Sequence, residues 1–266
     1  EIISNKKSLN IIEAFLEIYT ELEFKAWTEE LENKQGLFSR ETSASESQTN
    51  ASKEPLDISS EIKYEVILEL SHLKKWITKI TNSELLAIDT ETDSLDYMSA
   101  KLIGISMSVK PNSAAYIPLG HDYLGAPEQL DKETVLNQLR PILENPHVKK
   151  VGQNIKFDMS VFRQHGINLR GISFDTMLES YVINSIATRH DMDSLASTYL
   201  NLATTKFTDV AGKGAKKLTF NQIDLDQAAP YASEDADITL KLHENLWSKS
   251  RTNMHLNQCS RKLNYP

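Results

Sequence analysis

The chain has 266 residues, of which 40% are hydrophobic and 25% charged, and its formal net charge is −8. This composition is typical of a soluble globular protein, and no apolar run is long enough to predict a membrane span or a secretory signal. The acidic balance argues against a module that binds nucleic acid by phosphate neutralisation alone, but it is compatible with an enzyme whose carboxylates hold cations.

The single cysteine, Cys259, excludes an internal disulfide and favours a reducing, cytoplasmic compartment. Because the first residue is Glu1 rather than Met, we expect a fragment of a longer protein.

The chain divides by composition into four parts. Residues 1–38 are predicted to be a short helical segment, because apolar residues recur there at helical spacing. Residues 39–57 contain almost nothing apolar and are predicted to be a flexible linker. Residues 58–248 are predicted to form one compact domain, and residues 249–266 a tail without clear periodicity.

Within the compact domain, apolar runs predict strands and amphipathic stretches predict helices. Strands are predicted at 63–68, 85–90, 101–109, 114–119 and 149–153. Helices are predicted at 69–80, 131–144, 155–165, 176–185, 192–200 and 226–248. Asp175 and Asp191 are candidate caps for two of these helices. Three early strands with short links, followed mostly by helices, indicate an α/β fold in which a mixed sheet is flanked by helices.

Acidic residues follow an apparent core strand in the sequence LLAIDTETDSL, residues 85–95. Asp89 and Glu91 are two residues apart on that strand, so both side chains leave the same face. An Asp-x-Glu pair is common in an acidic chain, and a solvated strand end is the alternative explanation.

A third carboxylate, that of Asp158, falls on the apolar stripe of the helix predicted at 155–165. A carboxylate on a core-facing stripe is costly unless a cation or a donor neutralises it. The alternative to a bound cation is a salt bridge to Lys156 or Arg163.

The last predicted helix supplies a fourth carboxylate. Tyr231 and Asp235 are one helical turn apart on its buried stripe, whereas Glu234 and Asp237 are predicted to be solvated. Four inward carboxylates, Asp89, Glu91, Asp158 and Asp235, could together hold two hard divalent cations. Two such ions ~3.5–4 Å apart can stabilise both the attacking and the leaving oxygen of a phosphodiester displacement.

Six stretches of the sequence resemble the 3′→5′ proofreading exonuclease domain of bacterial DNA polymerase I: DTETDSLD, VGQNIKFD, FDTMLESYVINS, RHDMDSLA, AGKGAKKLTFNQI and YASEDADITL. The resemblance covers about residues 60–247. Residues 1–38 more faintly resemble the end of the 5′-nuclease domain of the same polymerase. The polymerase domain is missing and the tail after Trp247 does not match it, so we expect a truncated or frame-disrupted product.

The resemblance implies an RNase H-like fold of the DEDD exonuclease type and a two-metal exodeoxyribonuclease that proofreads DNA in the bacterial cytoplasm, near the nucleoid, in replication and repair. Asp89, Glu91 and Asp235 would ligate the first divalent ion, Mg²⁺ or alternatively Mn²⁺ or Zn²⁺. Asp89 would bridge to a second ion, which Asp158 would hold largely through water. Tyr231 would orient the attacking water.

The resemblance also implies contacts to a single-stranded or frayed 3′ end of DNA. Leu95 and Phe207 would wedge against the terminal bases in a sequence-tolerant way, with ordinary core packing as the alternative. The other implied contacts to the strand end are Thr92, Gln153, Asn154, Arg189 and Tyr231. For Arg189 the alternative is a surface salt bridge, and His190 is expected to be a loop residue rather than a base.

Two other functions remain open at this point. An exonuclease related to RNase D would use the same acidic motifs on RNA. A non-catalytic nucleic-acid-binding scaffold could keep the fold without the reaction, although the four carboxylates and Tyr231 argue against it.

Overall fold

The computed structural model describes residues 61–252, except residues 187, 215 and 216. The helical segment predicted at 1–38, the linker predicted at 39–57 and the tail beyond residue 252 lie outside the described residues. Within the described range, no helix is both long enough and apolar enough to cross a membrane.

The predicted α/β architecture is confirmed. The strands are β1 (Lys63–Val66), β2 (Leu86–Thr92), β3 (Leu102–Lys110), β4 (Ser113–Pro118), β5 (Lys150–Gly152) and β6 (Ile172–Asp175). The helices are α3 (Leu70–Thr81), α4 (Lys132–Leu143), α5 (Lys156–Gln164), α6 (Thr176–Ile183), α7 (Met192–Leu195), the π-helical η1 (Ala196–Leu200), α8 (Phe207–Ala211), the 3₁₀ turn η3 (Phe220–Gln222) and α9 (Leu225–Thr252). The strand β6, the helix α8 and the turn η3 were not predicted, and α9 runs to Thr252 rather than to residue 248.

The six strands form one mixed sheet in the order β1-β4-β3-β2-β5-β6. The pairs β2–β3 and β3–β4 are antiparallel, and the pairs β1–β4, β2–β5 and β5–β6 are parallel. Because β5 has three residues and pairs only with Leu86 and Ala87 of β2, the later part of β2 has no strand beside it on that side. That open edge lies next to the acidic residues.

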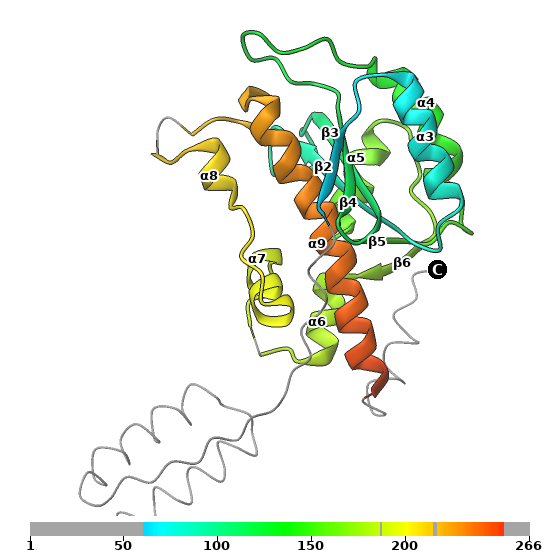
Figure 1. The fold of residues 1–266 in the computed structure, drawn as a ribbon, viewed down its shortest axis with the longest axis vertical. Helices are drawn as coiled ribbons and strands as arrows, with labels where there is room; N and C mark the ends of the chain where they lie inside the picture. The colour runs from blue at the N-terminus through cyan, green and yellow to red at the C-terminus, as the bar shows by residue number, and fades with distance from the viewer. Residues whose placement is uncertain (1–60, 187, 215–216, 253–266) are drawn as a thin grey trace, which may run out of the picture. The chain divides into compact units, whose positions relative to one another are not determined.

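Helices cover both faces of the sheet, with α3 and α4 on one side and α9 on the other (Figure 1). Leu86 and Ile88 of β2 belong to the core shared with α3, α4 and α5. Ala87, between them, packs in a cluster with Leu240 of α9. Because strand side chains alternate between faces, the residues that follow with the parity of Ala87, Asp89 and Glu91, point to the side of α9.

Helix α9 approaches the sheet through small side chains. Ala228, Ala232 and Ala236 recur every four residues and are fully buried, so they form one stripe along the helix. With no larger side chain on that stripe, the helix backbone can lie close to β2, β3 and β4. This packing sets the position of Asp235 and Tyr231 on the same helix.

Asp237 corrects one of the predictions, because its side chain is fully buried rather than solvated. Its carboxylate accepts hydrogen bonds from the Tyr64 hydroxyl at 2.8 Å and the Asn112 backbone N–H at 2.7 Å. It also pairs with the Lys241 ammonium at 2.6 Å, one turn along the helix. Asp237 therefore ties α9 to β1 and to the turn between β3 and β4. Glu234 is partly exposed and accepts a hydrogen bond from Thr205 N–H at 2.8 Å.

We expect Asp237→Ala to lower the free energy of unfolding by about 3 kcal/mol, because a buried hydroxyl and a buried N–H lose their acceptor while an ammonium loses its counter-charge. Chemical denaturation would measure the loss. Asp226→Ala removes an exposed carboxylate from the first turn of the same helix and should cost less than 1 kcal/mol. Equal losses in the two variants would contradict the anchoring role of Asp237.

Candidate metal centre

Three carboxylates from two elements converge on the α9 side of the sheet. Asp89 and Glu91 come from β2 and Asp235 from α9, and one ligand oxygen from each lies within 4.8 Å of the other two. All three side chains are partly buried. The two-residue spacing on the strand gives both β2 carboxylates the same direction, as expected, and α9 brings the third against them.

The electrostatics of this cluster are unfavourable without a cation. Burial raises the pKa of the Asp89 carboxyl well above its ordinary value, and the charge of Asp235 adds to the rise. Burial, followed by the charges of Asp89, Asp235 and Asp158, likewise raises the pKa of Glu91. Burial raises the pKa of Asp235 to about 8. The Glu91 Oε1 atom is buried and has no hydrogen-bond partner among the described residues. Three oxygen ligands of this kind fit a hard divalent cation.

Asp158 lies at the open edge of β2, outside the group of three. One oxygen of its carboxylate accepts hydrogen bonds from the Thr90 N–H at 2.9 Å and the Thr90 hydroxyl at 2.6 Å. Neither Lys156 nor Arg163 makes an ion pair with Asp158 in the described part of the chain, so the salt-bridge alternative is wrong. Burial and the charge of Asp89 raise the pKa of the Asp158 carboxyl, so Asp158 belongs to the same electrostatic cluster.

Tyr231 stands one turn before Asp235, and its hydroxyl interacts with that carboxylate. Its ring packs on Phe207 and Phe220, with centroid distances of 6.1 and 6.0 Å. Burial and the negative charges of Asp235, Glu91 and Asp89 raise the pKa of the phenol. The hydroxyl therefore keeps its proton at neutral pH and can act as a hydrogen-bond donor.

Asp175 organises the chain between β5 and α6. Its carboxylate accepts the backbone N–H groups of Met177 and Leu178, which confirms the predicted helix cap. The same carboxylate also accepts the N–H groups of Asn154 and Ile155 at the start of α5. This second role was missed, because no local pattern links residue 154 to residue 175. Asp175 thus fixes the position of the start of α5, the helix that carries Asp158.

Gln153 and Asn154, two of the predicted contacts to a strand end, lie in different environments. The Gln153 side-chain amide donates to the His190 carbonyl at 2.8 Å and accepts from the Thr176 hydroxyl, so both of its ends are already paired within the protein. Asn154 is exposed and has a left-handed backbone, with φ of 57°. His190 lies in the loop after α6, as expected, and its Nδ1 is 2.7 Å from the Ser180 hydroxyl.

The remaining predicted contacts lie nearer the surface. Leu95 is 92% exposed, so the core-packing alternative is wrong for this residue. Phe207 is partly buried and packs against the cluster that contains Phe220. The Arg189 guanidinium is 3.1 Å from Asp191, and its side chain is 88% exposed. The Thr92 hydroxyl donates to the backbone carbonyl of Ser94 at 2.8 Å.

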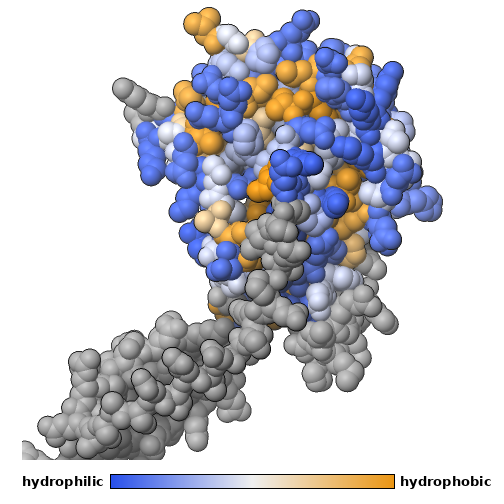
Figure 2. All heavy atoms as spheres, in the orientation of Figure 1, coloured by the Kyte–Doolittle hydropathy of each residue, from blue (hydrophilic) through white to orange (hydrophobic). Residues whose placement is uncertain are grey.

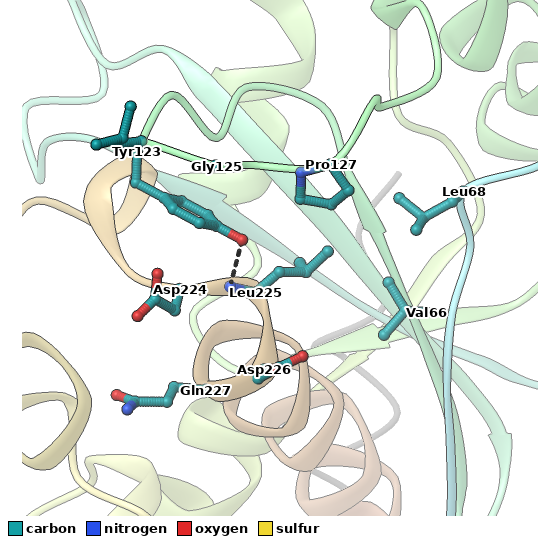
Figure 3. Close-up of a pocket in the computed structure, with 10 residues that line it drawn as sticks. Val66, Leu68, Tyr123, Gly125, Pro127, Asp224, Leu225, Asp226 and Gln227 are labelled. Atoms are coloured by element: carbon teal, nitrogen blue, oxygen red, sulfur yellow. Dashed lines mark hydrogen bonds between the residues drawn. The ribbon is translucent and has the colours of Figure 1, made fainter.

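A cavity of 740 Å³ lies apart from these residues, between β1, the loop after β4 and the start of α9. Figure 3 shows Val66 and Leu68 on one side of it and Asp224, Asp226 and Gln227 on the other. The Tyr123 hydroxyl accepts a hydrogen bond from Leu225 N–H at 3.1 Å (Figure 3). None of the predicted site residues lines this cavity, so it has no part in the acidic centre.

Comparison with known proteins places this chain in a family. The model of a family described as "3'-5' exonuclease" matches residues 64–251. DNA polymerase I of Pseudomonas aeruginosa is 49% identical over 239 residues, which are 89% of this chain and 25% of that protein. DNA polymerase I of Rhizobium leguminosarum is 39% identical over 196 residues, which are 67% of this chain and 19% of that protein. The chain therefore spans a quarter or less of the length of these relatives.

Solved structures share the fold at low sequence identity. RNase D of Trypanosoma brucei superposes with a TM-score of 0.56 at 15% identity, over 70% of this chain and 64% of that one. A structure described as the POL domain of Pol1 from M. smegmatis, in complex with DNA primer-template and dNTP, gives a TM-score of 0.55 at 18% identity, over 74% of this chain and 29% of that one. The predicted RNase H-like fold is confirmed by these likenesses.

The raised carboxyl pKa values predict how stability depends on pH in EDTA. Asp235 has a folded pKa of about 8, against roughly 3.9 for an unfolded chain. Between these values the folded state binds more protons than the unfolded state, so the free energy of unfolding falls as pH rises. We expect the melting temperature to drop from pH 5 to pH 8, and Asp235→Asn to reduce that drop.

Added Mg²⁺ should raise the melting temperature of the parent at pH 8 more than that of Asp235→Asn, because only the parent keeps the full ligand set. Asp226→Asn, at an exposed position of the same helix, should keep the pH dependence and the Mg²⁺ response of the parent. A parent protein whose stability in EDTA is flat from pH 5 to pH 8 would contradict this account.

Proposed function

The chain belongs to the 3′-5′ exonuclease family, and from that membership we propose that it removes nucleotides one at a time from the 3′ end of DNA. The observation that carries the proposal is the convergence of Asp89, Glu91 and Asp235 within 4.8 Å, with a buried Glu91 oxygen that lacks a partner among the described residues. The chain covers only 25% of the Pseudomonas aeruginosa relative. A role in proofreading, replication or repair would belong to a longer protein, and we propose it as such.

We propose that the site holds two divalent ions. Mg²⁺ is the preferred ion, and Mn²⁺ and Zn²⁺ are the alternatives. Asp89, Glu91 and Asp235 would hold the first ion, and Asp89 and Asp158 the second. The fit rests on the donor set, which consists of carboxylate oxygens alone, and on the raised carboxyl pKa values. When bound, such ions supply positive charge that stabilises a phosphodiester displacement and favours a deprotonated water at neutral pH.

The chain's own residues would then position the reacting groups. A water molecule attacks the phosphorus of the terminal phosphodiester and loses a proton, and the bond from phosphorus to the O3′ of the preceding nucleotide breaks. The products are a nucleoside 5′-monophosphate and a strand shortened by one residue, whose O3′ gains a proton. Tyr231 would orient the attacking water by a hydrogen bond rather than deprotonate it, because burial and the nearby carboxylates raise the pKa of the phenol.

The substrate would be a single-stranded or frayed 3′ end. Leu95, which is 92% exposed, would wedge against the terminal bases from the β2 side, and Phe207 from α8. Thr92, Gln153, Asn154 and Arg189 would complete the contacts to the strand end. Gln153 would need to exchange its internal hydrogen bonds to do so, or else act by holding the loop of His190.

DNA is favoured over RNA by the two relatives of 49% and 39% identity, both of which are DNA polymerases. RNA is the second candidate, because the fold is shared with RNase D of Trypanosoma brucei. In a longer protein, a polymerase domain would deliver the duplex to this site. The proposed location of that protein is the cytoplasm, beside the nucleoid. This chain, with a net charge of −8, would hold duplex DNA weakly by itself.

We expect Mg²⁺-dependent shortening of a 5′-labelled single strand of DNA, with no shortening in EDTA. Paired blunt ends should be degraded more slowly than single strands, and a matched RNA oligonucleotide more slowly than DNA. Asp158→Asn should nearly abolish cleavage, while Asp226→Asn should cleave like the parent. Faster degradation of RNA would favour the RNase D-like alternative, and near-parental cleavage by Asp158→Asn would rule out its role as a ligand.

Tyr231→Phe tests the role of the phenol. Removal of a group that only orients water should slow cleavage by about 10²–10⁴-fold or less, with little change in the affinity for single-stranded DNA measured in EDTA. Single-turnover rates and fluorescence anisotropy would give the two quantities. A loss as large as that of Asp89→Ala would show instead that Tyr231 organises the carboxylates.

A further inference from the structure

Three large apolar side chains are exposed in the loop of residues 93–101, which follows β2. Leu95 is 92% exposed, Tyr97 47% and Met98 73%. The three lie within four positions, directly after the strand that carries Asp89 and Glu91. Figure 2 shows that the face in view is largely hydrophilic, with separate hydrophobic patches. Grouped apolar side chains in solvent are a feature of binding surfaces.

The backbone of this loop is tightly held. The Asp96 carbonyl accepts the N–H groups of Ser99 at 3.0 Å and Ala100 at 2.8 Å, and the Asp96 carboxylate accepts the Met98 N–H at 3.1 Å. The Tyr97 carbonyl accepts the side-chain amide of Gln164, at the end of α5. The loop is closed by Lys101 N–H, which donates to the Asp93 carboxylate at 2.8 Å. The apolar side chains are therefore presented on a fixed frame, so little conformational entropy is lost on binding.

Cationic side chains accompany the loop. Lys101 is exposed at its end, and the Lys132 ammonium at the start of α4 donates to the backbone carbonyl of the next residue, Leu102, at 2.8 Å. Helix α5, whose last residue Gln164 contacts the loop, carries Lys156 and Arg163 seven residues apart, both exposed. Positions seven apart share a helix face. Apolar and cationic groups thus occur together, as in sites that stack bases and pair phosphates.

We propose that Tyr97 and Met98 form a platform for the bases upstream of the two nearest the 3′ end of single-stranded DNA, with Lys101 and α5 facing its phosphates. This inference rests on the proposed function and extends its substrate site. Continuity with Leu95 argues for nucleic acid as the occupant, because one rigid loop carries both the wedge and the platform. A protein surface docked on the same side chains is the competing outcome.

The platform predicts that longer single strands bind better than short ones. The parent should show a lower KM for a nine-nucleotide strand than for a three-nucleotide strand, in Mg²⁺. The double variant Tyr97→Ser/Met98→Ser should lose most of that difference. Its affinity for the nine-nucleotide strand in EDTA should fall by about 5- to 100-fold, as expected when a stacking side chain is removed. Leu124→Ser, a fully exposed apolar position in the loop after β4, should keep the parent's length dependence.

A second measurement reports on contact rather than turnover. With 2-aminopurine at the third position from the 3′ end, binding in EDTA should change its fluorescence with the parent and with Leu124→Ser, but not with the double variant. Thermal melting would show that the double variant is folded. If the parent cleaves and the double variant keeps both the length dependence and the fluorescence change, the platform is overturned and the proposed function stands. A parent that cleaves no strand overturns both.

Discussion

The acidic centre exists because the packing of β2 and α9 holds mutually repelling carboxylates together. Asp89, Glu91 and Asp235 lie within 4.8 Å although burial and the neighbouring charges favour their neutral forms. The apolar residues of β2 and the buried alanine stripe of α9 fix the two backbones from which these carboxylates extend. The scaffold thus stores an unfavourable interaction that a bound cation would relieve.

Aspartates serve two different purposes in this chain, and their hydrogen-bond partners distinguish them. Asp175 accepts four backbone N–H groups and Asp237 accepts a hydroxyl, an N–H and an ammonium. These two are structural braces whose charge is satisfied by the fold. Glu91, in contrast, keeps a buried oxygen without a partner in the part of the chain that the structure describes. Within the same described part, Glu179 also has a buried oxygen without a partner, but its other oxygen is 2.8 Å from His243 Nδ1, whereas Glu91 lies among other carboxylates.

Much of the fold and part of the centre could be predicted from the sequence, because both depend on local periodicity. The alternation of β2 set Asp89 and Glu91 on one face, and the helical spacing of α9 put Tyr231 one turn from Asp235. Asp237 was misplaced because two of its three partners, Tyr64 and Asn112, are 173 and 125 residues away in the chain. The position of Asp158 relative to β2 depends on where β5 stops.

The stretch from Glu234 to Asp237 has a consequence for how the sequence of this helix can change over time. Glu234 holds Thr205, Asp235 faces the acidic centre, Ala236 is fully buried against the sheet and Asp237 anchors the β3–β4 turn. Four consecutive residues therefore make contacts on four sides of the helix, and none of them is a surface position that any polar residue could occupy. Substitutions should therefore accumulate slowly at all four positions, because of packing as much as of chemistry. The motif reflects the contacts on every side of this helix as well as the place of Asp235 at the acidic centre.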